Sequence, residues 1–435
     1  MNKKAARTVL VLFLLTIMIV FVFLGTLEMA KAQSSDSNGD PNTWSMLHNN
    51  LGHTGYSASS APTTKKLLWT FTTGASVEFT SPAVADGVVY VGSDDGNLYA
   101  LNAATGALEW NYTTPYPVDE SSPAVADGVV YVGSQGYLYA LNGTTGTLEW
   151  SFPVSDPGYD VNSPSVANGV VYCTDVNYLF AVNAATGAQE WNYSNYEEGS
   201  PAVANGMVYI GASNQGSTDY LTALNATTGA LDWNYTIASA DMRVYGAPAV
   251  ANGVVYFGAI PGGSATFGEV YALNAATGAL EWNQTLNDSG VLFDSSPAVA
   301  NGVVYLGSGD DNLYALNSAT GAIEWNFTLG GAIESSPAIS ANGVVYVGAD
   351  DYNFYALSAA TGSLEWSYAT GGEVKSSPAI ANGVVYVGSW DNNVYAFGTP
   401  TTAVPEFPSI ITVAIALMIA TAATLLYKKT KPSAR

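Results

Sequence analysis

Ala100-Leu101-Asn102-Ala103-Ala104-Thr105-Gly106-Ala107-Leu108-Glu109-Trp110 is the first of seven closely similar tracts in the chain. The other six keep Ala, then Asn or Ser, then Thr-Gly, and end at Trp150, Trp191, Trp233, Trp282, Trp325 and Trp366. Successive tryptophans are 40 to 43 residues apart, except for one step of 49. A period of this length with four short strand-like runs per unit is typical of a β-propeller, whose units must stack to bury their apolar faces.

Each repeat predicts four strands, which we name A to D from the centre of the propeller outward. In the first repeat they begin near Ser81, Val88, Leu98 and Leu108. Between A and B lies an Asp-Gly or Asn-Gly pair, which favours a type I′ hairpin turn because that turn needs positive φ at both central residues. All eight repeats have such a pair, at Asp86-Gly87, Asp127-Gly128, Asn168-Gly169, Asn205-Gly206, Asn252-Gly253, Asn301-Gly302, Asn342-Gly343 and Asn382-Gly383.

The two ends of the repeat region complement each other. A first D-strand tryptophan, Trp69, has no repeat before it, and the last repeat stops at Gly398 without a D strand. We therefore expect Leu67–Phe71 to supply the outer strand of the eighth blade, beside the segment around Tyr395, which closes the ring. The predicted fold is an all-β, eight-bladed propeller of four-stranded blades, and the 49-residue step indicates a longer loop at Ile260–Glu269.

These tracts resemble the PQQ-like propeller repeat family, whose docking pattern is Ala-x-Asp-x-x-Thr-Gly, three residues, then Trp. The resemblance covers about residues 42–398, with Asn or Ser (Ser358) in place of the Asp. It implies the fold shared by quinoprotein dehydrogenases and the propeller lipoprotein of outer-membrane protein assembly. The enzymes' quinone site has a vicinal disulfide, a Ca²⁺ and a catalytic Asp, but this chain has one cysteine, Cys173, which we expect in the core. We expect no cofactor and consider PQQ unlikely for that reason.

Both ends of the chain carry apolar segments typical of export and anchoring. Residues 1–32 read as a signal peptide, cleaved after Ala30-Lys31-Ala32, or as an uncleaved anchor. Residues 33–64 form a leader that we expect to pack on the propeller of residues 65–398. A linker, 399–409, precedes a predicted transmembrane helix, 410–427, and a basic cytoplasmic tail, 428–435. Val404–Ser409 resembles the Pro-Glu-Phe sorting tail of archaeal surface proteins, and tail processing with lipid attachment remains an alternative.

The charge distribution agrees with an extracytoplasmic, membrane-anchored propeller. Between Gln33 and Ser409 there are 34 acidic residues (35 in the chain, less Glu28) and 4 basic ones, a net charge of about −30. Phosphate binding needs a basic face, so nucleic acid is excluded as a partner. Eight Asn-x-Ser/Thr sequons occur, and some are expected to be glycosylated, although a chain rich in Asn and Thr also produces sequons by chance. They lie at Asn111, Asn142, Asn192, Asn225, Asn234, Asn283, Asn287 and Asn326.

The two faces of the predicted propeller differ. A–B and C–D turns, which repeat almost unchanged, lie on one face, whereas B–C and D–A loops, which vary in every blade, lie on the other and favour recognition. Two sets of acidic residues mark the variable face. The B–C loops contribute Asp94, Asp95, Asp310, Asp311, Asp350, Asp351 and Asp391. The residues before the A strands are Glu78, Glu120, Asp160, Glu198, Asp294, Glu334 and Glu373.

We expect the second set to surround the mouth of the central channel and to attract cations or a cationic partner. The B–C aspartates are candidate Ca²⁺ ligands, although Asp and Asn also occur there simply to form turns. Trp390, beside Asp391, is a candidate for stacking on a sugar or anchoring a partner, or else for packing within the blade. Tyr137 and Tyr352 are weaker candidates of the same kind.

Catalysis finds little support in the residues. The only histidines, His48 and His53, lie in the leader, where we expect them to pack rather than bind a metal. Without a propeller histidine no Ser-His-Asp set forms, and no pair among the many carboxylates stands out as a glycosidase pair. We therefore expect a monomeric, non-catalytic binding or scaffold module for an envelope glycan, a surface protein or another cell. The alternatives are a PQQ-dependent dehydrogenase and a purely structural envelope component.

Overall fold

The computed structural model describes residues 40–154, 159–194, 196–213, 219–237, 242–244, 246–261, 267–287 and 295–398. The predicted signal segment, linker, membrane helix, basic tail and Pro-Glu-Phe motif lie outside these residues and stay predictions. Across the ranges given, no helix has the length and hydrophobicity that a membrane crossing requires.

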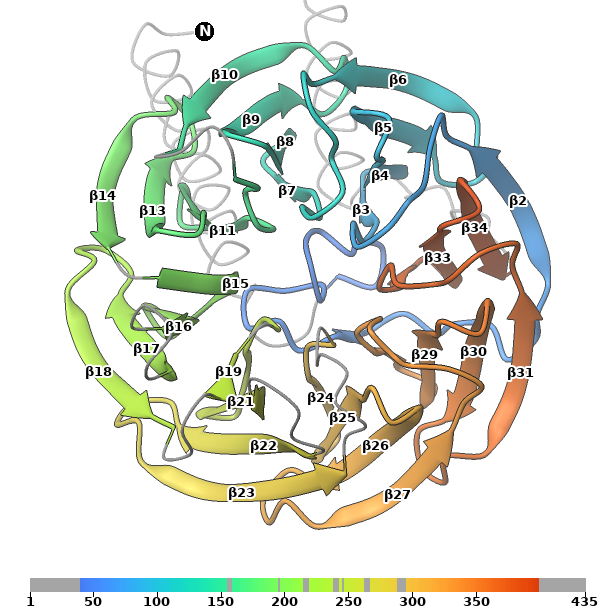
Figure 1. Ribbon diagram of the computed structural model, residues 1–435. Helices are drawn as coiled ribbons and strands as arrows, with labels where there is room; N and C mark the ends of the chain where they lie inside the picture. Colours follow the sequence, from blue (N-terminus) through green and yellow to red (C-terminus); the bar gives the residue numbers. More distant parts are fainter. Residues whose placement is uncertain are drawn as a thin grey trace, which may run out of the picture. The chain divides into compact units, whose positions relative to one another are not determined.

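Eight antiparallel sheets stand in a ring around a central channel, which confirms the predicted propeller (Figure 1). The innermost A strands are β3 (Ala83–Ala85), β7 (Ala124–Ala126), β11 (Ser165–Ala167), β15 (Tyr196–Ala204), β20 (Ala249–Ala251), β24 (Ala298–Ala300), β28 (Ala338–Ser340) and β32 (Ala379–Ala381). The B strands are β4 (Val88–Gly92), β8 (Val129–Ser134), β12 (Val170–Thr174), β16 (Met207–Ser213), β21 (Val254–Pro261), β25 (Val303–Gly307), β29 (Val344–Gly348) and β33 (Val384–Ser389).

The outer half of each blade consists of a C and a D strand. The C strands are β5 (Asn97–Asn102), β9 (Tyr137–Asn142), β13 (Tyr178–Asn183), β17 (Asp219–Asn225), β22 (Phe267–Asn274), β26 (Asn312–Asn317), β30 (Asn353–Ser358) and β34 (Asn393–Gly398). The D strands are β6 (Leu108–Thr113), β10 (Leu148–Pro153), β14 (Gln189–Ser194), β18 (Leu231–Thr236), β23 (Leu280–Asn287), β27 (Ile323–Thr328), β31 (Leu364–Ala369) and β2 (Leu67–Thr72). Two short strands, β1 (Tyr56–Ser57) and β19 (Met242–Arg243), join the seventh and fifth blades.

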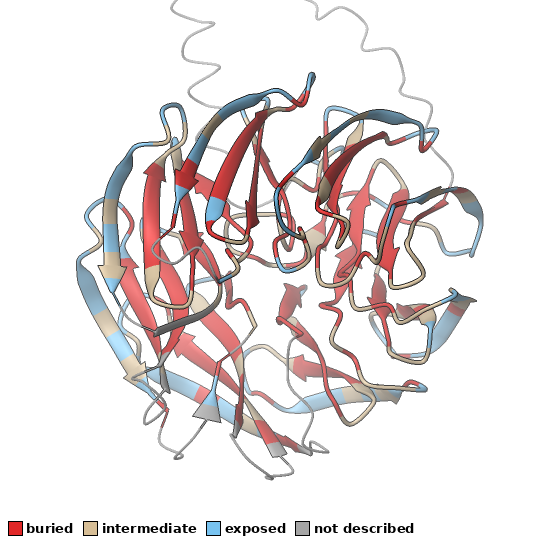
Figure 2. Ribbon diagram, turned by 45° about the horizontal axis from the view of Figure 1, so that its top comes forward, coloured by how far each residue is buried: buried red, intermediate tan, exposed pale blue. Residues whose placement is uncertain are grey.

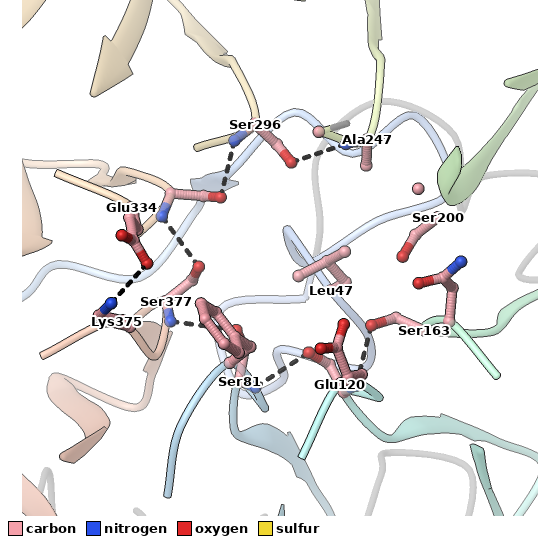
Figure 3. A pocket seen from close by; sticks show the side chains of 16 residues that line it. Leu47, Ser81, Glu120, Ser163, Ser200, Ala247, Ser296, Glu334, Lys375 and Ser377 are labelled. Carbon is pink, nitrogen blue, oxygen red and sulfur yellow. Dashed lines mark hydrogen bonds and ion pairs between the residues drawn. The ribbon is translucent and has the colours of Figure 1, made fainter. Parts of the chain in front are cut away.

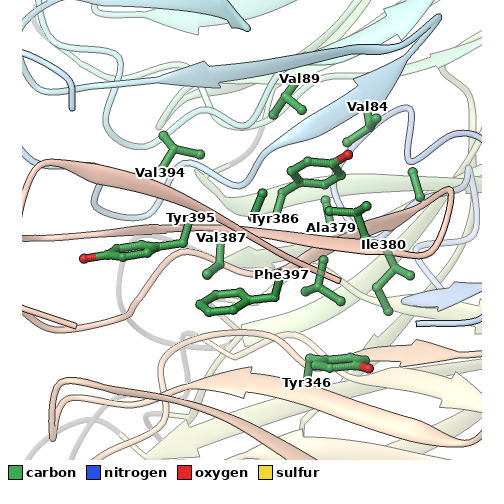
Figure 4. Close-up of a cluster of buried hydrophobic side chains, with 14 of the residues drawn as sticks. Val84, Val89, Tyr346, Ala379, Ile380, Tyr386, Val387, Val394, Tyr395 and Phe397 are labelled. Carbon is green, nitrogen blue, oxygen red and sulfur yellow. The ribbon is translucent and has the colours of Figure 1, made fainter. Parts of the chain in front are cut away.

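Burial falls from the B and C strands to the D strands, as the hydrophobic pattern requires (Figure 2). The continuous apolar runs of B strands are buried on both faces, because each blade packs against two neighbours. One such cluster fills the space between the seventh, eighth and first blades, where Tyr346, Tyr386 and Phe397 are buried (Figure 4). Cys173 lies fully buried in another cluster, as expected.

The A–B turns follow the prediction in seven blades and depart from it in one. In Asp86-Gly87 and its six equivalents both central residues have positive φ, between 50° and 83°. The seventh blade has one additional residue, Ala341, so Asn342 is not in the left-handed region and the predicted type I′ turn is wrong there. The Asn342 amide instead exchanges two hydrogen bonds with the backbone of Ala61 in the leader.

The predicted closure of the ring is confirmed. Strand β2 pairs antiparallel with β34, with Trp69 opposite Ala396 and Thr70 opposite Tyr395. The eighth blade is therefore built from both ends of the propeller segment, and an early strand locks against a late one.

Adjacent blades are joined through the D-strand tryptophans, which we call docking tryptophans. The indole N–H of each donates to a backbone carbonyl at 2.9–3.3 Å, in seven cases a carbonyl of the next blade, and a tyrosine of its own B strand donates to the same oxygen. The eighth blade has no C–D turn to accept these bonds, and Pro62 of the leader supplies the carbonyl for Trp366 and Tyr346. The leader thus completes the joint between the seventh and eighth blades.

The leader also runs through the central channel (Figure 1). Its carbonyls accept hydrogen bonds of 2.6–2.7 Å from the A-strand N–H groups of Val125, Val203, Val250, Val299 and Ile339, and Trp44 forms a bridge with Val84. These N–H groups belong to the free inner edges of the sheets, so the leader satisfies them. His48 and His53 are buried, as expected for packing residues, and burial lowers their pKa values to about 4 and about 3.

Candidate binding site at the channel mouth

The leader leaves a pocket at one end of the channel. We name the side of the A–B and C–D turns the turn face and the side of the B–C and D–A loops the loop face. The pocket, of about 220 Å³, opens on the loop face, where the A strands begin (Figure 3). It is lined by Leu47, Phe79, Ser81, Glu120, Ser122, Asn162, Ser163, Gly199, Ser200, Gly246, Ala247, Ser296, Glu334, Ser336, Lys375 and Ser377.

A ring of serines forms the wall of this pocket. In each of six blade junctions a backbone N–H donates to the serine hydroxyl oxygen of the next blade, at 2.8–3.1 Å. The series passes from Ser377 to Ser81 and so continues across the point where the ring closes. Ala247 takes the serine position in the fifth blade and supplies no hydroxyl. The sequence repeats show these serines, but their role in linking blades was not predicted from them.

Lys375 is the central charge on one side of the mouth, and sequence reasoning missed it as a site residue. Its ammonium lies 3.0 Å from Glu334, 3.3 Å from Glu373 and 3.9 Å from Asp350. It also lies 4.6 Å from the centre of the Trp390 ring, a cation–π arrangement. Burial opposes the charge on Lys375, but Glu334, Asp350 and Glu373 together raise its pKa, so the ammonium stays protonated. We call these five residues the lysine cage.

A second acidic group, which we call the open cluster, lies at the mouth next to the lysine cage, whose Lys375 is 5.7 Å from the ring centre of Phe79. It consists of Glu78, Asp94 and Asp119. Burial, reinforced by the charges of Glu78 and Asp119, raises the pKa of Asp94 to about 7, and burial also raises that of Glu78. One carboxylate oxygen of Asp94 is buried without a hydrogen-bond partner. Within the described ranges no basic group forms an ion pair with this cluster.

The aspartates of the B–C turns divide into two kinds. Asp95, Asp310, Asp351 and Asp391 form the turns: each accepts a hydrogen bond from the backbone N–H two residues later and one from a tyrosine hydroxyl four residues later. Hydrogen bonds from Tyr99, Asn97 and Gly74 outweigh burial and lower the pKa of Asp95. The turn-forming alternative therefore accounts for these four residues.

Aligning these turns on their turn-forming aspartates also shows which of the other loop residues are equivalent. Asp94, Gly309, Asp350 and Trp390 occupy one equivalent position, the residue before each turn aspartate. Asp311 follows the turn-forming Asp310 and is therefore not equivalent to Asp94. It occupies the left-handed position of its turn, with a φ of 67°. Within the described residues no three or more His, Cys, Asp or Glu side chains converge as metal ligands, and Ca²⁺ binding by the B–C aspartates stays a prediction.

The other predicted mouth residues are placed as follows. Glu120 and Glu334 line the pocket, and Glu373 reaches it through Lys375. Asp160 lies near Asp119, and burial, with Asp119, raises its pKa. Asp294 and the side chain of Glu198 are outside the described part of the chain. Trp390 packs under Lys375 with its indole N–H buried and unbonded, while Tyr352 is half exposed and Tyr137 slightly less so.

The residues present do not fit a quinone site of the kind that the resemblance implies. Cys173 lies buried in the third blade and is the only cysteine in the sequence, so a vicinal disulfide cannot form. Burial raises the pKa of its thiol, so it is unreactive. Within the described residues, no group of three or more His, Cys, Asp or Glu side chains is placed to hold a metal. We derive no chemistry through such a group.

Solved structures share this fold at low sequence identity. A europium-containing methanol dehydrogenase matches 86% of this chain and 100% of its own length, with 16% identity and a TM-score of 0.70. BamB from Moraxella catarrhalis matches 78% and 98%, with 19% identity and a TM-score of 0.63. The quinohemoprotein alcohol dehydrogenase from Comamonas testosteroni matches 85% and 82%, with 16% identity and a TM-score of 0.67. Identities this low show the fold alone.

Comparison with sequences gives the family. No curated protein matches the chain significantly. A family model described as outer membrane protein assembly factor BamB matches four stretches, residues 57–167, 160–266, 262–331 and 319–403. These stretches cover the propeller from the leader to its last strand, and the chain therefore belongs to this family of PQQ-like propeller repeats.

Proposed function

We propose that this chain is a non-catalytic binding module, held at the outer surface of a membrane, whose channel mouth recognises a cationic group on a partner. The observation that carries the proposal is the contrast between the lysine cage and the open cluster. In the cage, three carboxylates and an aromatic ring surround an ammonium that the chain itself supplies.

The open cluster has the same kind of charge, but no basic group of the described residues forms an ion pair with it, and Lys375 acts on Glu78 only at longer range. Bringing a partner's ammonium or guanidinium beside Asp94 would lower the pKa of that carboxyl and relieve the repulsion among Glu78, Asp94 and Asp119. A net charge of −23 would also attract a basic partner over long range. A surface protein with an exposed lysine or arginine side chain is therefore the preferred partner class, ahead of a neutral glycan.

Calorimetric titration of the detergent-solubilised full chain with a polylysine peptide tests the proposal. We expect the double variant Asp94→Asn, Asp119→Asn to weaken binding about tenfold, since two charge contacts of about 0.7 kcal/mol each would be lost. The matched control, Glu109→Gln with Glu324→Gln, removes the same charge from D strands away from the mouth. Equal weakening in both variants would show that only the overall charge attracts the peptide.

The competing function is that of a quinone-dependent dehydrogenase, which is favoured by the fold similarity to two alcohol-oxidising enzymes. Fold similarity does not carry the activity, because function resides in site residues. Purified protein incubated with PQQ and Ca²⁺ should reduce no dye when alcohols or sugars are added. Turnover that depends on the quinone would replace the proposed function.

A further inference from the structure

The outer wall of the propeller carries a sequence regularity that the fold does not require. The residue that follows the docking tryptophan is Asn in five blades and Ser or Thr in the other three. The five are Asn111, Asn192, Asn234, Asn283 and Asn326, and all are exposed. The other three positions are held by Ser151, Ser367 and Thr70. Exchange among Asn, Ser and Thr shows that packing does not fix the residue.

The residue two positions later differs between the five blades with a wall Asn and two of the other three blades. After each of the five asparagines it is Ser or Thr, as in Asn111-Tyr112-Thr113, so every wall Asn is part of a sequon. After Ser151 and Ser367 it is Pro153 and Ala369, whereas after Thr70 it is Thr72, which bonds Asn393 as Thr113 bonds Asn97. In an extended strand residues i and i+2 point to the same side, and here both point outward. Asn111 and Thr113 indeed bond the same oxygen of Asn97.

The asparagines of the C–D turns form an internal comparison. Their position holds Asn in six blades, yet only Asn142 and Asn225 belong to sequons. In each turn the Asn side-chain oxygen accepts hydrogen bonds from backbone N–H groups two or three residues later, with or without a sequon. The turn therefore explains these asparagines completely, and their two sequons arise from Thr at a position that other repeats fill with Ala.

We propose that Asn111, Asn192, Asn234, Asn283 and Asn326 are N-glycosylated, while Asn142 and Asn225 are not. This inference rests on the export included in the proposed function, and the co-reactant is a lipid-linked saccharide phosphate. The bond from the anomeric carbon to the phosphate oxygen breaks, a bond to the Asn side-chain nitrogen forms, and one amide proton is lost. The second amide hydrogen remains, so the bond from Asn111 to Asn97 survives.

Glycans on this wall would protect exposed strand edges and exposed apolar side chains from contact with other chains. Each D strand is the outer edge of its sheet in the described structure, with backbone groups open to pairing by another chain. Each of seven D strands also exposes nearly half of one aliphatic side chain, Leu67, Leu108, Leu148, Leu231, Leu280, Ile323 or Leu364. Charged residues, the usual protection of such edges, form only 11% of the chain. Glycans on five blades would keep these edges apart.

Glycopeptide mass spectrometry of the full chain, purified from membranes of its native host, tests the inference. We expect saccharide mass on all five wall asparagines and none on Asn142 or Asn225. A gain-of-site variant sharpens the test: Ser367→Asn with Ala369→Thr places a sequon on the seventh blade and should add one further glycan. The matched turn variant, Ala104→Thr, creates a sequon at Asn102 and should add none.

Protease accessibility on intact cells, measured in parallel, separates this inference from the proposed function. Exported protein with unmodified wall asparagines would overturn the inference and leave the binding function standing. Equal modification of wall and turn sequons would overturn it as well. Protein that is not exported would instead contradict the proposed function on which the inference rests.

Discussion

The turn face and the loop face of this propeller are built from the same eight repeats, yet they differ in how strictly those repeats are kept. On the turn face every blade has the same docking joint, and the leader supplies Pro62 where a joint would be missing. On the loop face the position of Asp94 is filled elsewhere by Gly309, Asp350 or Trp390. Uniform positions hold the blades together, and uneven ones are free to recognise a partner.

The largest expected effect comes from breaking the joint where the ring closes. Trp69→Ala removes a buried indole and its hydrogen bond to Ala103. We expect a loss of about 4 kcal/mol in the free energy of unfolding, measured by urea titration. Tyr116→Ala, which removes a half-exposed side chain on the loop face, should cost less than about 0.5 kcal/mol. Similar losses in the two variants would contradict the structural role of the joint.

Two glycines of the fourth blade separate a docking role from a turn role. Both have positive φ, +68° at Gly229 and +76° at Gly206. A Cβ on Gly229 would lie 2.6 Å from the Trp191 ring, whereas a Cβ on Gly206 would meet nothing within 4 Å. We expect Gly229→Ala to cost about 3 kcal/mol and Gly206→Ala about 1 kcal/mol, since only the first adds a clash to backbone strain. A reversed order in thermal melting would be inconsistent with this packing.

Asp94 and Asp95, neighbours in one B–C turn, allow the same comparison between a structural and a recognition residue. Asp95 accepts hydrogen bonds from the backbone N–H groups of Gly74 and Asn97 and from the Tyr99 hydroxyl. We expect Asp95→Asn to destabilise the protein by about 2 kcal/mol at pH 7, because an amide replaces an acceptor of three bonds. Chemical denaturation at that pH provides the measurement, and an unchanged midpoint would argue against the turn-forming role.

Asp94 should behave in the opposite way, and its effect should depend on pH. Its pKa in the folded protein, about 7, lies above the value of 3.8 for an unperturbed aspartate. The folded state therefore binds more protons than the unfolded state between these values, so this carboxyl stabilises the fold at low pH and the stabilisation is lost as pH rises through 7. Asp94→Asn should thus raise the melting temperature at pH 8 by a few degrees relative to wild type.

The same substitution should change the melting temperature little at pH 4, where Asp94 is largely protonated in the folded protein. The two leader histidines have the opposite effect on the pH dependence of stability. The folded pKa values of His48 and His53 are depressed, so acidification from pH 6.5 towards 4 costs stability in wild type and variant alike. The difference between the two proteins isolates Asp94, and an equal shift at both pH values would exclude the raised pKa as its cause.

The sequence predicts the uniform parts of the repeats better than the variable loop face. The repeat of Thr-Gly and Trp predicted eight blades, the pairing of Trp69 with the end of the last repeat and the buried Cys173, because those positions obey a periodic rule. One additional residue, Ala341, was enough to change a turn that its Asn-Gly pair alone predicts as type I′. A prediction from the repeat pattern alone does not capture the effect of a single inserted residue on a turn.

The candidate site was harder to predict. Glu120 and Glu334, two of the predicted mouth residues, line the pocket, but Lys375 was counted only as one of few basic residues. Its contacts come from the D–A and B–C loops of the seventh and eighth blades, four loops in all, and no spacing in the sequence reveals such a set. Likewise, Asp94 and Asp95 look equivalent in the sequence, although Asp95 forms the turn and Asp94 lies against Glu78 at the mouth.

Hydrogen exchange of the full chain with and without a bound polylysine peptide distinguishes recognition on the loop face from recognition on the turn face. We expect slower exchange in loops around the mouth, at residues 74–80, 93–96 and 116–122, and no change in the C–D turns. Protection of the turns at residues 102–107 and their equivalents, with unchanged mouth loops, would place recognition on the turn face and contradict the proposed function.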